Sequence, residues 1–245
     1  MDGQIIDIRG HRAEYRCAFE DFVQLYRRTF TDPAEAEDPA GWEERLDRHF
    51  DPPEPTTHLL VAGQNLKGAD CQLWGGLVFE HYRLSGCGLM TYVAVDPEHR
   101  GKGVAKTLTQ TAIQTLHDAA RAEGKPLRMV FGEAEDPRKV NASRAAIDPS
   151  MRLKVLVALG AKWVNIPYVQ PKLLGGSGRC RSLLLLAFDW QGSPSPQADG
   201  AAVVDFLREF YQCLEMPRPD EDVEFAGMIR AVPSELVLKE LPMER

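Results

Sequence analysis

Cysteine is scarce in this chain of 245 residues, and the few cysteines follow no recognised pattern. They are Cys17, Cys71, Cys87, Cys180 and Cys213, an odd number without any CxxC spacing. This distribution is typical of reduced thiols in the cytoplasm, and it argues against a disulfide framework or a structural zinc site. We therefore expect free thiols and no bound metal.

Long hydrophobic runs, a leader sequence and an excess of basic residues are also missing. The longest apolar run, LLLLAF from Leu183, is too short to span a bilayer, and the start MDGQIIDIRG lacks the order of a signal peptide. Lys and Arg number 29 against 36 Asp and Glu, a formal net charge of −7. This balance argues against nucleic-acid and membrane binding. We expect a cytoplasmic protein with small-molecule or peptide partners, cationic ones being favoured.

Helical and strand patterns alternate along the chain, without an internal repeat. Apolar spacing predicts, in order, helices over 19–30 and 41–50, strands over 58–64, 74–84 and 88–95, a helix from Val104 to Gly124, a strand over 127–135, a helix over 150–160, and a hairpin built from KWVNIPYVQ and RSLLLLAFDW. The first three strands should form an antiparallel meander. The strand, helix and strand that follow should form a parallel crossover.

The C-terminal part of the sequence is separated from this pattern. WQGSPSPQADG, from Trp190 to Gly200, is rich in Gly, Pro and Ser and is typical of a linker. We therefore divide the chain into a domain over 1–190, a linker over 191–200 and a helical extension over 201–245. The extension carries an apolar stripe that must pack against a surface. We expect it to dock on its own chain, with a homodimer interface as the alternative.

HRGKGVA, from His99 to Ala105, lies where a strand gives way to a helix. Backbone N–H groups of such a turn point into one concavity, and the helix dipole favours an anion there. Two familiar phosphate motifs are absent: there is no GxxxxGK[ST], and Lys106 occupies the place of the third glycine in GxGxxG. Taken alone, the stretch is explained equally well by a solvated strand-to-helix turn.

Within this order of elements, VAVDPEHRGKGVA resembles the signature of the GNAT superfamily of acyl-CoA N-acyltransferases. The family pattern [RQ]-x-x-G-x-[GA] is met by Arg100, Gly103 and Ala105, and the resemblance extends from about Phe19 to Trp190. It implies an α/β fold whose mixed, mostly antiparallel sheet contains a splayed parallel pair and carries helices on both faces.

The resemblance also implies acetyl-CoA as the acyl donor. The cofactor-binding residues that it implies are, for the pyrophosphate, Arg100, Gly101, Lys102, Gly103, Val104 and Ala105, and, for the pantetheine arm, the main chain of Val93 and Val95.

The residues for proton transfer depart from the family pattern. The position where some members carry a glutamate falls at Leu89 or Met90, and Leu156 replaces the tyrosine that often serves as general acid. Acyl transfer to a protonated amine nevertheless needs a base. A substitute must therefore come from elsewhere in the chain.

FGEAEDP offers that substitute. Glu133 and Glu135 are two apart on a strand and so share a face, although a solvated strand end explains them equally well. Tyr168 is the candidate acid, with a packing role as its alternative, and Glu80 and His81 are further candidates for the acceptor pocket.

The sequence thus predicts direct transfer of acetyl from acetyl-CoA to a primary amine, on a small molecule or a peptide. The alternative is a non-catalytic acyl-CoA-binding or regulatory module, because two family side chains are replaced. Cys87 and Cys180 have no recognisable base partner in the sequence, which disfavours a covalent acyl-cysteine.

Overall fold

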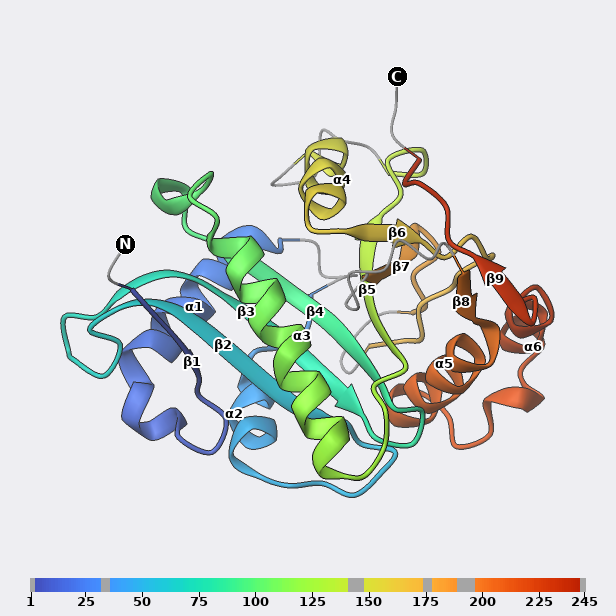
Figure 1. Cartoon of the computed structure of the whole chain (residues 1–245), viewed down its shortest axis with the longest axis horizontal. Coiled ribbons are helices and arrows are strands. Elements are labelled where there is room, and N and C mark those ends of the chain that lie inside the picture. Colours follow the sequence, from blue (N-terminus) through green and yellow to red (C-terminus); the bar gives the residue numbers. More distant parts are fainter. Residues whose placement is uncertain (1–2, 32–35, 141–147, 174–177, 189–196, 243–245) are drawn as a thin grey trace.

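A computed structural model describes the chain except for residues 1–2, 32–35, 141–147, 174–177, 189–196 and 243–245 (Figure 1). Seven strands form one sheet in the order β1-β2-β3-β4-β5-β7-β6. They are β1 (Gln4–Asp7), β2 (Thr56–Gln64), β3 (Gln72–Tyr82), β4 (Cys87–Val95), β5 (Met129–Glu135), β6 (Ala161–Trp163) and β7 (Leu183–Phe188). β4 and β5 run parallel, and every other neighbouring pair is antiparallel. The mixed, mostly antiparallel sheet predicted from the sequence is confirmed.

Helices cover both faces of this sheet, as predicted. α3 (Val104–Ala122) and α4 (Pro149–Ala158) pack on one face, and Figure 1 shows α3 lying across β2–β4. The stripe of α3 that includes Leu108, Ala112 and Leu116 is fully buried. Gly88 of β4 lets this helix approach, because a Cβ there would collide with Leu116. α1 (Arg16–Thr29) and α2 (Ala40–Asp47) cover the β2–β4 half of the other face.

The C-terminal part covers the remainder of that second face. α5 (Gly200–Leu214) and α6 (Val223–Arg230) share one apolar cluster with β5 and β7, in which Phe206 stacks on Phe131 with ring centroids 4.3 Å apart. β8 (Gln197–Asp199) and β9 (Glu235–Val237) form a small separate sheet. Of the predicted linker, residues 191–196 lie outside the described residues, whereas residues 197–200 belong to β8 and α5.

Two local predictions differ from the structure. β1 lies in a stretch for which the sequence predicted no strand, and it pairs with β2 through Ile5↔Ala62 and Ile6↔Val61. The final hairpin is shorter than predicted, because β6 ends at Trp163 and the chain continues irregularly to an isolated bridge between Gln170 and Cys180. The NIPYVQP segment contains two prolines, which cannot donate to a strand ladder.

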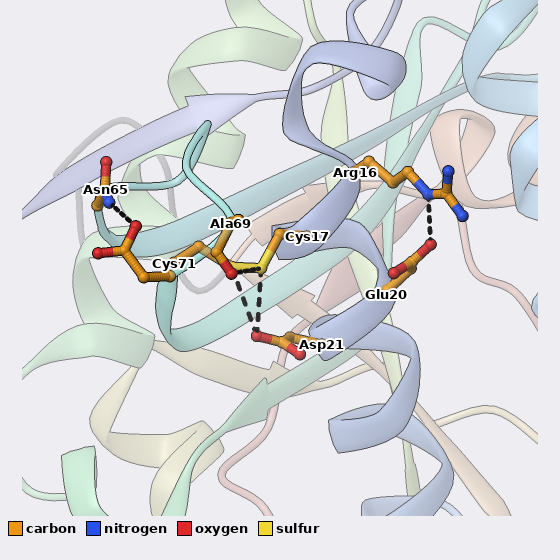
Figure 2. Close-up of a disulfide and its surroundings, with 8 residues drawn as sticks. Arg16, Cys17, Glu20, Asp21, Asn65, Ala69 and Cys71 are labelled. Atoms are coloured by element: carbon orange, nitrogen blue, oxygen red, sulfur yellow. Dashed lines mark hydrogen bonds and ion pairs between the residues drawn. A yellow bond between two sulfur atoms is a disulfide. The ribbon is translucent and has the colours of Figure 1, made fainter.

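The prediction that all cysteines are reduced is wrong for one pair. Cys17 and Cys71 form a disulfide with Cα atoms 6.3 Å apart (Figure 2). Their 54-residue separation hid the pairing in the sequence, and it is the packing of α1 near the β2–β3 connection that brings them together. Cys87, Cys180 and Cys213 are free. No helix in the described ranges is both long and apolar enough to cross a membrane.

The disulfide should contribute measurably to stability. Reduction, or Cys17→Ser, is expected to lower the free energy of unfolding by about 2–4 kcal/mol, because the bond closes a long loop in the unfolded chain. Urea unfolding with and without a phosphine reductant, in the presence of a chelator, measures this difference. Cys213→Ser is the control and should leave the midpoint unchanged. Identical midpoints for oxidised and reduced protein would show that the bond does not constrain the fold.

Candidate active site

The sheet opens between β4 and β5. Among the described residues their pairing runs from Cys87↔Met129 to Met90↔Gly132, after which β4 continues to Val95 and β5 to Glu135 without further partners in common. The β3–β4 register shifts at the same place, from Val78↔Tyr92 to Phe79↔Met90, so that Thr91 is an extra residue. Such a bulge bends its strand away from the neighbour. The last residues of β4 therefore present backbone groups into a widening gap, where an extended ligand can hydrogen-bond.

The HRGKGVA turn lies at the wide end of this gap. Gly101 and Gly103 have φ of +72° and +84°, and α3 begins at Val104. A Cβ at either glycine would meet no atom within 4 Å. Glycine is therefore favoured here by the left-handed backbone and not by steric crowding. The first amides of a helix have no intrahelical acceptor. In α3 the bond from Thr107 N to the oxygen of Gly103, at 3.0 Å, is the first to close, which leaves the preceding amides for an anion.

Basic side chains surround the turn. Arg100, Lys102 and Lys106 are exposed, and Arg100 Nε donates to the carbonyl oxygen of Val95 at 3.2 Å. His99 stacks on Trp74 with ring centroids 5.4 Å apart. The turn thus joins exposed main-chain donors to a local positive charge, as an anion site requires.

A pocket lies on the sheet face that α1, α2 and α5 cover. Its empty volume is about 630 Å³, with open solvent at its mouth included. Residues from α2, β3, β4, β5, α4, β7, α5 and the α1–α2 and β6–β7 connections line it: Phe30, Glu37, Arg45, Glu80, Leu89, Thr91, Tyr92, Glu133, Ala134, Arg152, Gln170, Leu173, Leu183, Phe210 and Leu214. The pocket therefore begins where β4 and β5 separate, and it combines aromatic walls with several charged groups.

Glu133 is the central acidic group of this pocket. Tyr168 donates its hydroxyl to Oε1, and Gln170 Nε2 donates to Oε2 at 3.0 Å. Burial raises the pKa of Glu133 to about 7, although the two hydrogen bonds oppose the shift and the charge of Glu80 adds to it. At neutral pH Glu133 is therefore present in both protonation states, as suits a group that takes and returns a proton.

Tyr168 supports Glu133. Its ring is 4% exposed, and burial together with Glu133 raises the pKa of its hydroxyl well above the usual value. Tyr168 therefore keeps its proton at neutral pH and acts as a hydrogen-bond donor toward Glu133. The structure thus brings together two residues that the sequence singled out separately.

Glu135 has different surroundings, although it shares the face of β5. Arg152 Nη1 donates to Glu135 Oε2 at 3.1 Å, and Glu135 does not line the pocket. Glu80 does line it, and its Oε2 accepts from the hydroxyl of Tyr82 at 2.8 Å. His81 is the next residue of β3, so it points to the opposite face of the sheet.

Glu37, Arg45 and Glu80 form an ion-pair cluster beside these residues, which the sequence did not predict. Arg45 Nη2 donates to Glu37, which also accepts from Trp42 Nε1 at 2.6 Å, and Arg45 Nη1 lies 4.0 Å from Glu80 Oε1. Burial opposes the charge of Arg45, but Glu37 and Glu80 outweigh it and raise the pKa of the guanidinium. No signal in the sequence marks these residues, because charged groups in a helix and an acidic loop are ordinarily solvated.

Two buried polar atoms in the pocket lack a hydrogen-bond partner among the described residues. They are Arg45 Nε and Thr91 Oγ1. Buried polar groups are nearly always paired, so these atoms mark places where a bound molecule or water can be held. Thr91 is also the bulged residue of β4, which connects the polar pocket to the gap between the strands.

Comparison with known proteins agrees with this geometry. Residues 19–136 match the model of the Acetyltransferase (GNAT) family. This match, over a little under half of the chain, supports the GNAT superfamily. No curated protein matches it.

Solved structures that resemble this chain are distant in sequence. The ribosomal-protein-S18-alanine N-acetyltransferase of Escherichia coli is 12% identical, with 76% of this chain and 92% of that chain covered and a TM-score of 0.45. The spermidine/spermine N-acetyltransferase of Vibrio cholerae is 14% identical, with 76% and 91% covered and a TM-score of 0.45. The IAA acetyltransferase of Bacillus cereus is 16% identical, with 76% and 99% covered and a TM-score of 0.44.

Proposed function

We propose that this GNAT-family protein transfers an acetyl group from acetyl-CoA to a primary amine by direct attack. The observation that carries the proposal is the position of Glu133, a buried carboxylate with a pKa of about 7 in a pocket that begins where β4 and β5 separate. A carboxylate with this pKa can take a proton from an ammonium group at neutral pH and release it again before the next turnover.

The donor site follows from the turn and the strand edge. Main-chain amides from Gly101 to Ala105 would hold the pyrophosphate of coenzyme A, with Arg100 and Lys102 adding charge. Main-chain groups of Val93 and Val95 would bind the pantetheine arm as a strand partner would. These assignments need no metal.

The reaction can be written with the residues of the pocket. Glu133 accepts a proton from the ammonium form of the acceptor, and the free amine attacks the thioester carbon. The carbonyl oxygen becomes an oxyanion, for which an N–H of β4 near the bulge is the proposed donor. As the intermediate collapses, the carbon–sulfur bond breaks and coenzyme A leaves as a thiolate. The thiolate takes up the second proton, which the attacking nitrogen loses as it becomes an amide. Tyr168 orients Glu133 throughout, and this positioning role replaces the acid role first considered for it.

The acceptor is proposed to be cationic. Glu37, Glu80 and Glu133 all line the pocket, and opposite charge attracts a protonated amine. Two arginines of the pocket offset part of that charge: Arg45 is paired with Glu37 and lies near Glu80, and Arg152 is paired with Glu135. A small molecule and a peptide end both meet this description.

The C-terminal extension supplies one wall of the pocket through Phe210 and Leu214 of α5. Phe210→Ala is expected to raise the KM for the acceptor about tenfold, or to admit bulkier amines, while leaving the KM for acetyl-CoA unchanged. Met228→Ala is the matched control, because Met228 is buried in the same apolar cluster and does not line the pocket. Steady-state kinetics with a series of amines of increasing size measures the effect. An unchanged acceptor profile in Phe210→Ala would remove α5 from the acceptor site.

The competing proposal is an acyl-CoA-binding module without catalysis. It is favoured by two replacements: Leu89 or Met90 stands where some family members carry a glutamate, and Leu156 stands where a tyrosine often serves as general acid. Release of free thiol from acetyl-CoA, followed across amines, peptides and aminoglycosides, separates the two proposals. Amine-dependent release supports the transferase. Tight binding of coenzyme A together with no release above hydrolysis supports the module.

A further inference from the structure

Three metal-type ligands converge at the start of α1. The sulfur atoms of Cys17 and Cys71 and a carboxylate oxygen of Asp21 all lie within 4.8 Å of one another (Figure 2). They form the one such group of three or more His, Cys, Asp or Glu residues in the described part of the chain. Cys17 and Asp21 are four apart on α1 and so share a face of the helix, whereas Cys71 comes from the connection between β2 and β3. Each of the three is partly exposed.

The disulfide alone does not explain the position of Asp21. Its Oδ2 lies 3.5 Å from the sulfur of Cys71 and 4.0 Å from that of Cys17, and a disulfide has no hydrogen to donate. No N–H or hydroxyl donor to this carboxylate is present among the described residues. Asp21 thus lies beside the two sulfurs without a protein donor in the described part of the chain, and its negative charge repels them once they become thiolates. A cation at this point compensates all three groups.

We propose that the reduced form of this protein binds a thiophilic divalent cation of the zinc type through Cys17, Cys71 and Asp21. Two thiolates and a carboxylate are a donor set that Zn²⁺ accepts. The fourth position is available to water, or to the carbonyl oxygen of Ala69, which lies 3.7 Å from the sulfur of Cys17. The proposal replaces the sequence-based expectation that the chain binds no metal.

The disulfide is then the oxidised, metal-free state of the same site. A dithiol supplies two electrons and two protons and becomes a disulfide, whereas a phosphine supplies two electrons and becomes its oxide, with the protons and the oxygen coming from water. Either reductant breaks the sulfur–sulfur bond and gives two thiols. Binding of Zn²⁺ displaces those two protons. The sulfurs must separate to about 3.8 Å in a tetrahedral site with Zn–S bonds of about 2.3 Å, which small rotations of the two side chains provide. A peroxide can reverse the sequence: it takes two electrons from the thiolates and is reduced, while the sulfur–sulfur bond forms again and the cation is released.

This site is separate from the proposed transferase pocket. Cys17 lies in the first turn of α1, and Phe30, which lines the pocket, follows the last turn. At 1.5 Å per residue the two ends are about 20 Å apart. The metal site therefore does not depend on the proposed function and is tested without an activity assay.

Cobalt binding tests the proposal directly. The full-length protein is treated with chelator and a phosphine, exchanged into metal-free buffer, and titrated with Co²⁺ followed by Zn²⁺. We expect one equivalent of Co²⁺ to give sulfur-to-cobalt charge-transfer and tetrahedral d–d bands, which Zn²⁺ then removes. The oxidised protein should give no bands. Zn²⁺ should also raise the thermal midpoint of the reduced protein only.

Variants identify the ligands. Cys71→Ser should abolish the charge-transfer band at one equivalent, and Asp21→Asn should weaken Zn²⁺ binding at least about tenfold. Asp21→Asn keeps the disulfide, so its folding is checked in the oxidised state by thiol count and thermal midpoint. Cys213→Ser controls for an unrelated accessible thiol and should bind as the parent does. Absence of the bands in the reduced parent, or equal affinities in Asp21→Asn and parent, would leave a structural disulfide and overturn the proposal.

Discussion

Glu133→Gln is expected to lower kcat by about 10²- to 10⁴-fold at neutral pH, with little change in the affinity for coenzyme A. The change removes the proposed base but keeps the size of the side chain. The new amide oxygen can still accept from Tyr168, and the new NH2 can donate to the side-chain oxygen of Gln170 once that amide flips, so the pocket keeps its shape. Glu135→Gln is the control, because Glu135 shares the face of β5 with Glu133 but does not itself line the pocket, although its partner Arg152 does. Rates of thiol release for both variants and the parent decide the matter. If Glu133→Gln retains the parental rate, the base is Glu80 or solvent.

The proposed role of Glu133 as a base also predicts how kcat changes with pH. Burial raises the pKa of Glu133 to about 7, so the base form increases as the pH rises through 7, and kcat of the parent should rise with it and then level off. The Tyr168 hydroxyl lowers that pKa by its hydrogen bond. Tyr168→Phe should therefore shift the profile to higher pH, with a smaller loss at the plateau. Burial also makes ionised Glu133 costly to the fold above pH 7, so Glu133→Gln should not be less stable than the parent at pH 8.

Gly103→Ala is expected to weaken coenzyme A binding at least about tenfold. A methyl group at this position would meet no protein atom, but it would project from the turn at which the pyrophosphate is proposed to bind. The φ of +84° also makes alanine strained there, by roughly 1–2 kcal/mol. Loss of binding alone would therefore not separate a local block from a destabilised helix start.

Gly160→Ala provides the matched control for that strain. Gly160 has a φ of +91°, has open space around its Cβ direction, and follows α4 away from the turn. Both variants should lose similar stability in urea unfolding, whereas calorimetric titration should show weaker coenzyme A binding in Gly103→Ala alone. Equal affinities in the two variants would move the pyrophosphate to another part of the protein.

The sequence predicted those features that depend on local patterns. The apolar stripe of α3 predicted the helix, and Gly124 predicted its end. Both signals are local, because the stripe repeats every 3.6 residues and Gly124 adopts a left-handed backbone just after the last turn. The alternation of β5 likewise placed Glu133 and Glu135 on one face. The alternation could not predict that the two glutamates have different partners. Arg152, the partner of Glu135, and Tyr168, the partner of Glu133, come from distant segments.

Features that depend on distant contacts escaped prediction. The Cys17–Cys71 bond joins residues with no characteristic spacing, and the Glu37–Arg45–Glu80 cluster needs α2 packed on β3 before its charges meet. β1 is four residues long, too short for a periodic signal. Phe210 was expected within an apolar stripe, but only the fold shows that this stripe ends at the pocket.

A crystal structure of the protein with acetyl-CoA tests the central claim most directly. We predict that the pyrophosphate lies against the amides from Gly101 to Ala105, and that the thioester enters the pocket between β4 and β5. The carboxylate of Glu133 should then lie within reach of an attacking amine at the thioester carbon, directly or through one water. A thioester that lies outside this pocket, or nearer to Glu80 than to Glu133, would contradict the account.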